Sequence, residues 1–218
     1  MSNTKIDWCD ETINPLGWGC YGPGGTKEKP KICWYCYAKQ WAKETPYKVI
    51  CQDCMDFVPH YHLERLKGLT GKKPKKIFVQ SMGDLFGDWV DSFAIQRVIN
   101  FCSDRQQHTF MFLTKNPSRY FAFKFPENCW LGTTITGPKD LHRNFRTPDN
   151  KTFVSIEPLL YHFKNPRLPN DGENTFHHYD LVIVGAMTGP GAIPPKQEWI
   201  YSIKHPNIFY KDNIKPYL

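Results

Sequence analysis

Three cysteines near the N-terminus, Cys20, Cys33 and Cys36, have the type and spacing to bind one metal centre. Cys33 and Cys36 lie three residues apart, so both sulfurs point the same way if a helix begins there. A structural zinc site closes with four protein ligands, whereas an iron–sulfur cluster bound by three cysteines leaves one iron open to a non-protein ligand. The spacing also fits a zinc half-site completed elsewhere, or thiols that only pack.

A second set of candidate ligands lies in CQDCMDFVPHYH and comprises Cys51, Cys54, His60 and His62. Two thiolates and two imidazoles would make a structural zinc site, and the surrounding insert, residues 45–74, has too little apolar content to be stable without such a link. A single residue between the histidines makes chelation of one ion by both awkward, and Cys9 is an alternative ligand. Unligated side chains and an additional iron–sulfur cluster are the other interpretations.

The elements that would position these residues are short apolar segments alternating with segments of helical pattern. Buried strands are predicted at residues 12–19, 75–82, 108–114, 128–135, 152–160, 179–187 and 207–213. A helix is predicted over residues 91–104, with Asp91 and Ser92 as possible caps, and shorter helical segments follow the later strands. Nearly continuous apolar strands alternating with helices indicate a parallel sheet that is covered on the outside.

Polar residues at the C-terminal ends of six of these strands favour a barrel over a doubly wound sheet. We therefore predict an α/β fold, a partial (βα)6-type TIM-like barrel of parallel strands with an N-terminal cysteine loop and irregular inserts at residues 45–74 and 161–178. One domain over residues 1–218 is expected, because a single core can still grow at this length.

Composition narrows the functional classes. The formal net charge is +7, and a cationic run at residues 67–76 would suit phosphate contacts, although such runs are usually solvated loops. No apolar run approaches the roughly 20 residues that cross a bilayer, so we expect a cytoplasmic protein with no membrane partner. In a reducing compartment, eight cysteines indicate ligands or core packing rather than disulfides. Neither a hydrolase triad nor a phosphate-binding loop is recognisable.

Eight blocks in order resemble the DUF5131 family of phage Gp37/Gp68-like proteins, from about residue 5 to the C-terminus. The blocks are IDWCDETINPLGWGC, CWYCYAK, PHYHLERL, KKIFVQSMGDLFGDWV, HTFMFLTKNPSR, NCWLGTTIT, SIEPLL and LVIVGAMTGPGA. This family is similar to a divergent branch of the radical SAM enzymes, near the spore photoproduct lyase group. The usual pattern of those enzymes has three residues between the first two cysteines; here twelve residues, Tyr21 to Ile32, separate Cys20 from Cys33.

The resemblance implies that Cys20, Cys33 and Cys36 bind a [4Fe–4S] cluster whose open iron takes S-adenosylmethionine. An electron donor would then be a partner, and a 5′-deoxyadenosyl radical would abstract hydrogen from an unknown substrate, with nucleic acid or a nucleotide suggested by the family's tie to DNA repair. A non-catalytic, zinc-stapled module that binds nucleic acid is the alternative function. A barrel that has lost the radical reaction is a third.

Further residues are predicted to contact the cofactor. Tyr35 would pack over the cluster or its ligand, Ser81 and Asp84 would meet the methionine amine, and Gly185 would let adenine approach closely. Polar groups of ribose and methionine would be faced by Thr133, Thr134 and Glu157. The structural alternatives are that Asp84 only caps a loop and that the threonine pair only ends a strand.

Overall fold

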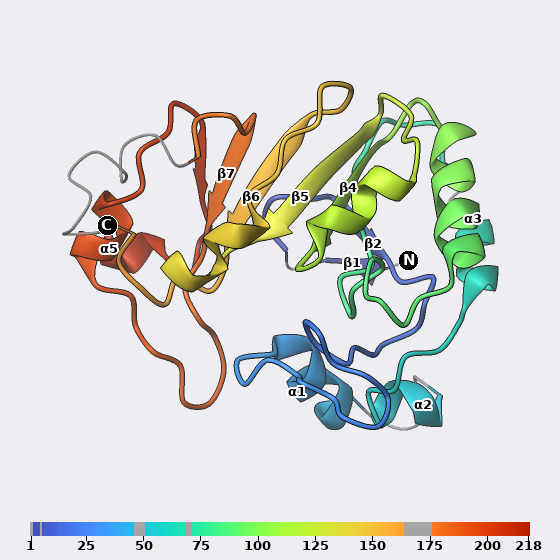
Figure 1. The fold of residues 1–218 in the computed structure, drawn as a ribbon, viewed down its shortest axis with the longest axis horizontal. Coiled ribbons are helices and arrows are strands. Elements are labelled where there is room, and N and C mark those ends of the chain that lie inside the picture. The colour runs from blue at the N-terminus through green and yellow to red at the C-terminus, as the bar shows by residue number, and fades with distance from the viewer. Residues whose placement is uncertain (1, 5, 46–50, 69–70, 164–175) are drawn as a thin grey trace.

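The protein is built around one β-sheet (Figure 1). The computed structural model describes residues 2–4, 6–45, 51–68, 71–163 and 176–218. The eight strands of the sheet follow one another in sequence order. β1 (Ser2–Asn3) pairs antiparallel with β2 (Glu11–Ile13), and every later pairing is parallel. The later strands are β3 (Lys76–Val79), β4 (Thr109–Thr114), β5 (Cys129–Thr134), β6 (Thr152–Ile156), β7 (Leu181–Val184) and β8 (Ile208–Tyr210).

The parallel strands, β2 to β8, curl into a half-barrel (Figure 1). The predicted α/β partial barrel is therefore confirmed, with seven parallel strands in place of the six of a (βα)6 unit.

Helical segments connect most of the strands. Between β2 and β3 lie α1 (Tyr37–Glu44), α2 (Gln52–Met55) and the 3₁₀ helix η1 (Leu63–Gly68). α3 (Ser92–Ser103) joins β3 to β4, and α5 (Gln197–Tyr201) joins β7 to β8. Three further 3₁₀ helices are η2 (Pro117–Ala122), η3 (Pro138–Arg143) and η4 (Lys215–Tyr217).

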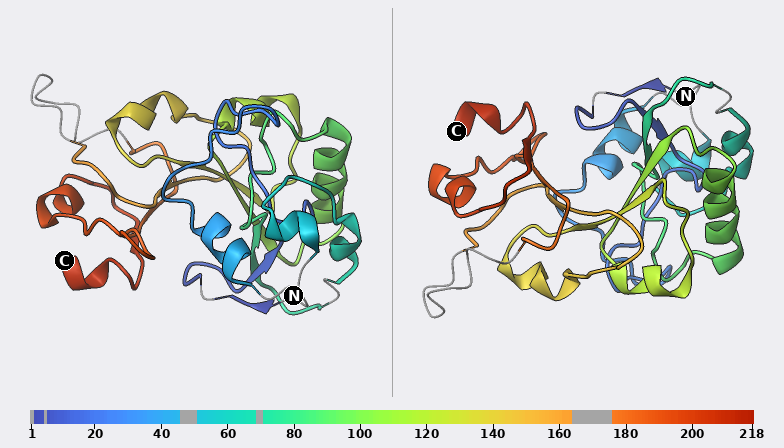
Figure 2. Two further views of the ribbon diagram at one scale, coloured as in Figure 1. Left: turned by 90° about the horizontal axis from the view of Figure 1, so that it is seen from below. Right: turned by 90° about the horizontal axis from the view of Figure 1, so that it is seen from above.

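Helices α1 and α2 lie on a different side of the molecule from α3 (Figure 1). α1 and α2 lie together beneath one end of the sheet, away from α3 (Figures 1 and 2).

Within the described part of the chain, no helix combines the length and apolar character needed to cross a membrane.

Both faces of the sheet are buried, which explains why its strands read as apolar runs rather than as alternating patterns. On one face Phe110, Phe112 and Val154 belong to the large core that includes α3. On the other face Phe78 and Phe153 pack against Trp8, with ring centroids 4.7 and 6.0 Å from it. Alternate residues of each strand thus supply two separate apolar clusters.

α3 matches the prediction closely. The carboxylate of Asp91 accepts a hydrogen bond from the backbone N–H of Phe93 at 2.6 Å and caps the helix N-terminus. Its buried residues recur at helical spacing and face the sheet: Ala94, Ile95, Val98, Ile99, Phe101 and Cys102.

The strands predicted to end at residues 82, 160, 187 and 213 end three or four residues earlier, at Val79, Ile156, Val184 and Tyr210. Two further predicted boundaries are wrong in the cysteine segment. The strand expected over residues 12–19 ends at Ile13, because Pro15 has no N–H to donate and the chain then turns, with the N–H of Gly17 bonded to the carbonyl of Asn14 at 3.2 Å. The helix expected at Cys33 begins at Tyr37, with Cys36 as its N-cap.

Replacing Asp91 with alanine should lower the free energy of unfolding by about 0.5–2 kcal/mol, because the amides of the first turn lose their acceptor. Asp91→Asn keeps a side-chain oxygen at the same place and should stay close to the wild type. Urea denaturation followed by circular dichroism measures both. Equal stability of the alanine and asparagine variants would show that the cap contributes nothing.

Candidate metal and cofactor sites

Four side chains in the first insert form a compact group that can hold a metal ion. The sulfurs of Cys51 and Cys54 and the Nε2 atoms of His60 and His62 all lie within 4.8 Å of one another. The Cys51 sulfur is 3.2 Å from His60 Nε2 and 3.3 Å from His62 Nε2. A tetrahedral zinc ion places sulfur and nitrogen ligands roughly 3.5 Å apart, so the spacing is near that of a liganded site. We call these four residues the Cys51 centre.

The histidines of the Cys51 centre are oriented by groups outside it. Nδ1 of His60 lies 2.7 Å from the carbonyl of Val58, and Nδ1 of His62 lies 2.6 Å from the carboxylate of Glu64. Because both partners only accept hydrogen bonds, each Nδ1 donates to its partner, which turns each Nε2 toward the thiols as the atom that would bind a metal. The single residue between the histidines does not prevent both rings from facing Cys51, and Cys9 is not a member of the group.

Electrostatics at the Cys51 centre also suit a metal. Burial alone would raise the pKa of Cys51. Hydrogen bonds to its sulfur from His62 and from the Cys54 backbone outweigh that effect and lower the pKa to about 6. Burial raises the pKa of Cys54, and the N–H of Trp18, which donates to the Cys54 sulfur at 3.4 Å, opposes this. A thiolate is therefore available near neutral pH in Cys51, as metal ligation requires.

The three N-terminal cysteines are free thiols, partly buried, near the carboxyl end of β3. Cys20 and Cys36 both pack against a small cluster that contains Met82, which follows β3. The backbone N–H of Gly22 donates to the Cys20 sulfur at 3.2 Å. Among the described residues, Cys20, Cys33 and Cys36 form no group of three or more ligand atoms compact enough for a single ion.

Lys115, at the carboxyl end of β4, connects these cysteines electrostatically. Burial lowers the pKa of Lys115, but Tyr35, Cys33, Asp84 and Cys20 raise it above its usual value. In turn, burial raises the pKa of Cys20 and of Cys36, and Lys115 opposes both increases. The Lys115 ammonium also lies 5.9 Å from the centre of the Tyr35 ring. Lys115 therefore interacts electrostatically with three thiols and a phenol.

The long segment between Cys20 and Cys33 folds back on itself. The N–H of Lys31 donates to the carbonyl of Tyr21 at 2.6 Å, and the N–H of Gly25 donates to the carbonyl of Gly22 at 3.0 Å. A Cβ added at Gly22 would lie 1.9 Å from the Lys31 carbonyl oxygen, so glycine is required where the two sides of the loop meet. Residues 22–30 therefore form a loop that the hydrogen bond between Lys31 and Tyr21 closes at its base.

Asp84 and Ser81 lie near the cysteines, and their side chains are already engaged. One Asp84 oxygen accepts from the Thr114 hydroxyl at 2.7 Å, and the other accepts from the Lys115 N–H at 3.0 Å. Asp84 also accepts from the N–H of Phe86 at 3.0 Å. Ser81 is buried and bonds Asn14 at 3.3 Å. Asp84 thus fixes a loop, and its contact with a methionine amine stays a prediction.

The remaining predicted cofactor residues lie along the next strands. Thr133 and Thr134 are buried, and the Thr133 hydroxyl donates to the carbonyl of Thr114 at 3.3 Å. Glu157 forms an ion pair with Lys211. A Cβ added at Gly185 would come within 3.2 Å of that pair, so Gly185 gives room to protein side chains. Their contacts with S-adenosylmethionine stay predictions.

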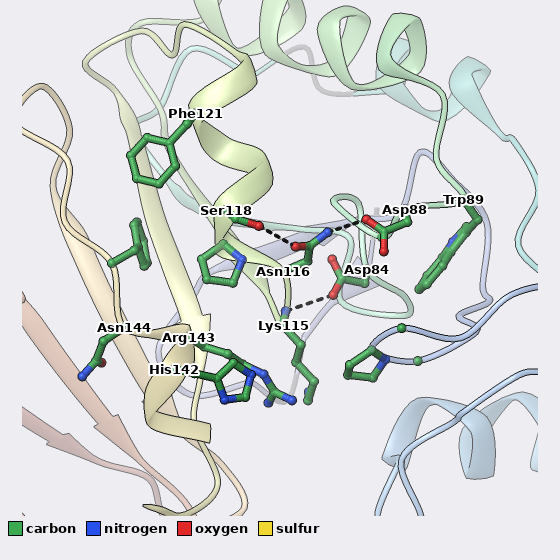
Figure 3. A pocket seen from close by; sticks show the side chains of 16 residues that line it. Asp84, Asp88, Trp89, Lys115, Asn116, Ser118, Phe121, His142, Arg143 and Asn144 are labelled. Atoms are coloured by element: carbon green, nitrogen blue, oxygen red, sulfur yellow. Dashed lines mark hydrogen bonds between the residues drawn. The ribbon is translucent and has the colours of Figure 1, made fainter. Parts of the chain in front are cut away.

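A cavity of about 510 Å³ opens beside the cysteine loop (Figure 3). Asp84 and Lys115, which border the cysteines, also line it. The lining also includes His142 and Arg143 of η3, and Phe121 of η2, which is 66% exposed. The sequence offered no local signal for these three residues, because they belong to short helices that carry no motif. The role of Glu64 beside His62 was also missed, since a carboxylate at that spacing is common without a metal.

Fold and site together define a parallel α/β partial barrel that carries a cysteine-rich segment and a Cys₂His₂ group at the carboxyl ends of its first strands. The chain belongs to the DUF5131 family, described as a protein of unknown function, whose model matches residues 3–208. No curated protein and no solved structure matches the chain significantly.

In metal-free protein at pH 7, iodoacetamide should modify Cys51 faster than Cys9. Cys51 is exposed and its pKa is about 6, whereas burial raises the pKa of Cys9 to about 12. The Cys51 rate should fall as the pH drops below about 6, because the thiolate is then protonated. One equivalent of zinc should suppress Cys51 labelling and leave Cys9 unchanged, as read by peptide mass spectrometry. Unprotected Cys51 in the presence of zinc would argue against the site.

Proposed function

We propose that this protein is a radical SAM-type iron–sulfur enzyme in which Cys20, Cys33 and Cys36 bind a [4Fe–4S] cluster. The observation that supports the proposal is that three partly buried thiols interact electrostatically with Lys115, at the carboxyl end of a strand of a parallel half-barrel. A partial parallel barrel is compatible with the radical SAM-like fold.

When bound, the cluster would pass one electron from a donor to S-adenosylmethionine, breaking its sulfonium bond to give methionine and a 5′-deoxyadenosyl radical that takes hydrogen from the substrate. The protein's own groups would support this by holding charge and excluding water. Lys115 offsets the negative charge of ligated thiolates, and the N–H of Gly22 stabilises the Cys20 sulfur. Tyr35, partly buried beside Cys33, would cover the site.

The cavity beside Lys115 would admit the substrate. His142 and Arg143 offer hydrogen-bonding nitrogens, although Arg143 is already ion-paired with Asp140 at 2.9 Å, and Phe121 and Trp89 offer aromatic surface. Donors near aromatic rings suit a phosphate and a base, so we propose a nucleotide or nucleic acid as the substrate class. An electron donor is the second proposed partner.

Zinc is the ion we propose for the Cys51 centre. Two thiolates and two imidazoles form a common tetrahedral zinc set, and both imidazoles are oriented from outside the site. This observation also favours the second candidate function, a non-catalytic, zinc-stapled module that binds nucleic acid. The two candidates differ in what Cys20, Cys33 and Cys36 hold.

Anaerobic purification with metal analysis separates the two functions. The enzyme should be brown with about four irons per chain and should release 5′-deoxyadenosine from S-adenosylmethionine when a reductant is added. Alanine at Cys20, Cys33 or Cys36 should abolish the iron and the product. Cys9→Ala should retain both, because Cys9 is neither one of the three proposed cluster ligands nor a member of the Cys51 centre, and its sulfur donates to the Ile6 carbonyl at 3.7 Å. A colourless protein that contains zinc alone would refute the enzyme and support the module.

A further inference from the structure

The insert that carries the Cys51 centre is bonded directly to the chain that leads into Cys20. The N–H of Trp18 donates to the Cys54 sulfur at 3.4 Å. The N–H of His62 donates to the carbonyl of Pro15 at 2.8 Å. Arg65 Nη1 donates to the carbonyl of Asn14 at 3.2 Å. Two of the four candidate ligands therefore take part in these bonds themselves.

Two glycines allow this contact between backbones. A Cβ added at Gly17, whose φ is +64°, would lie 2.4 Å from the His60 ring. A Cβ added at Gly19 would lie 2.4 Å from the carbonyl carbon of Val58. Any larger residue at either position would push the insert away, so the close fit of the two segments is a built feature of the chain.

The same segment is bonded to the barrel on its other side. The Gln80 side chain accepts from the N–H of Leu16 at 3.0 Å and donates to the carbonyl of Gly17 at 2.8 Å. The N–H of Gly19 donates to the carbonyl of Met82 at 3.0 Å. Cys20 is the next residue, so its position depends on how firmly both sides hold residues 14–19.

The barrel side is held by the parallel sheet, whereas the insert side has little regular structure and little apolar burial. Within the described residues 51–68, the regular structure is a four-residue α2 and the 3₁₀ helix η1. Its buried apolar residues are Cys54, Phe57 and Leu66. A segment of this kind depends on ligation for its shape, because its apolar burial is too small to offset the entropy of ordering.

We propose that a metal ion in the Cys51 centre fixes residues 14–19 and thereby positions Cys20 for its own ligand. Cys51, Cys54, His60 and His62 are then positioning residues for the N-terminal cysteine site. The second half of this inference rests on the proposed iron–sulfur function, and the first half does not.

Hydrogen exchange on cluster-free protein prepared in air tests the first half without iron. Zinc-loaded protein should protect the amides of Trp18 and Gly19, and removal of zinc by a chelator should speed their exchange roughly fivefold to tenfold, with recovery when zinc is returned. Peptides from β4 and β5 should not change, which verifies that the fold persists. Zinc binding with unchanged exchange at these two amides would overturn the inference, and so would failure to bind zinc.

Variants separate ligation from the mere presence of the side chains. Cys51→Ser and His62→Ala should lose zinc and show the fast exchange of the chelated wild type. His62→Cys supplies another zinc ligand and should restore both readouts. His177→Ala removes an exposed imidazole whose ring contact is with His205, and should behave as the wild type. If a variant unfolds as a whole, the reversible zinc titration of the wild type decides the question.

Anaerobic iron loading tests the second half. Cys51→Ser should bind severalfold less iron than the wild type, although Cys51 is not one of the cluster ligands proposed here. Wild-type levels of iron in that variant would refute the effect on Cys20. A wild type that takes up no iron would refute the proposed function, and the hydrogen-exchange result would still stand or fall independently.

Discussion

Parallel pairing of successive strands is the constraint on which both ligand sets depend. From β2 to β8 every strand runs in the same direction, so the loops at their carboxyl ends open along one edge of the half-barrel. The segment after Ile13, the loop at Asp84 and Lys115 meet there, although they are distant in sequence. Hydrogen bonds between strands thus assemble the site, and no disulfide is needed among the free cysteines of the described chain.

Hydrogen bonds to the Asp84 carboxylate fix the position of Lys115, which interacts electrostatically with the cysteines. The carboxylate bonds the Thr114 hydroxyl and the Lys115 amide, which fixes the start of the loop after β4. The Lys115 ammonium then lies among acidic groups that raise its pKa against the effect of burial. A partly buried cation surrounded by thiols is favourable when those thiols ionise, since each thiolate stabilises it. Lys115 thus opposes the rise that burial gives to the pKa of Cys20 and Cys36, although both pKa values stay above the usual value of a thiol.

Much of the fold could be predicted because it follows from local patterns. The strands are apolar over their whole length since both faces of the sheet are buried, and α3 shows its cap and its buried face in the sequence. The Cys51 centre was also predictable, because its four ligands lie within twelve residues, 51–62, and need only a short loop to meet.

Long-range packing decided what the sequence did not reveal. The start of α1 at Tyr37 and the end of β2 at Ile13 depend on turns whose bonds are not apparent from residue type. The convergence on Lys115 joins groups from three separate loops, and the approach of Gly17 to His60 requires a positive φ that a pattern of glycines does not specify. Such features arise from contacts between distant segments, which periodicity does not encode.

The hydrogen bond from Lys31 to Tyr21 changes how the distance between the first two cysteines should be counted. Across that bond, the route from Cys20 to Cys33 passes only Tyr21, Lys31 and Ile32, which is three residues rather than twelve. Length variation confined to residues 22–30 would then leave the sulfur positions unchanged.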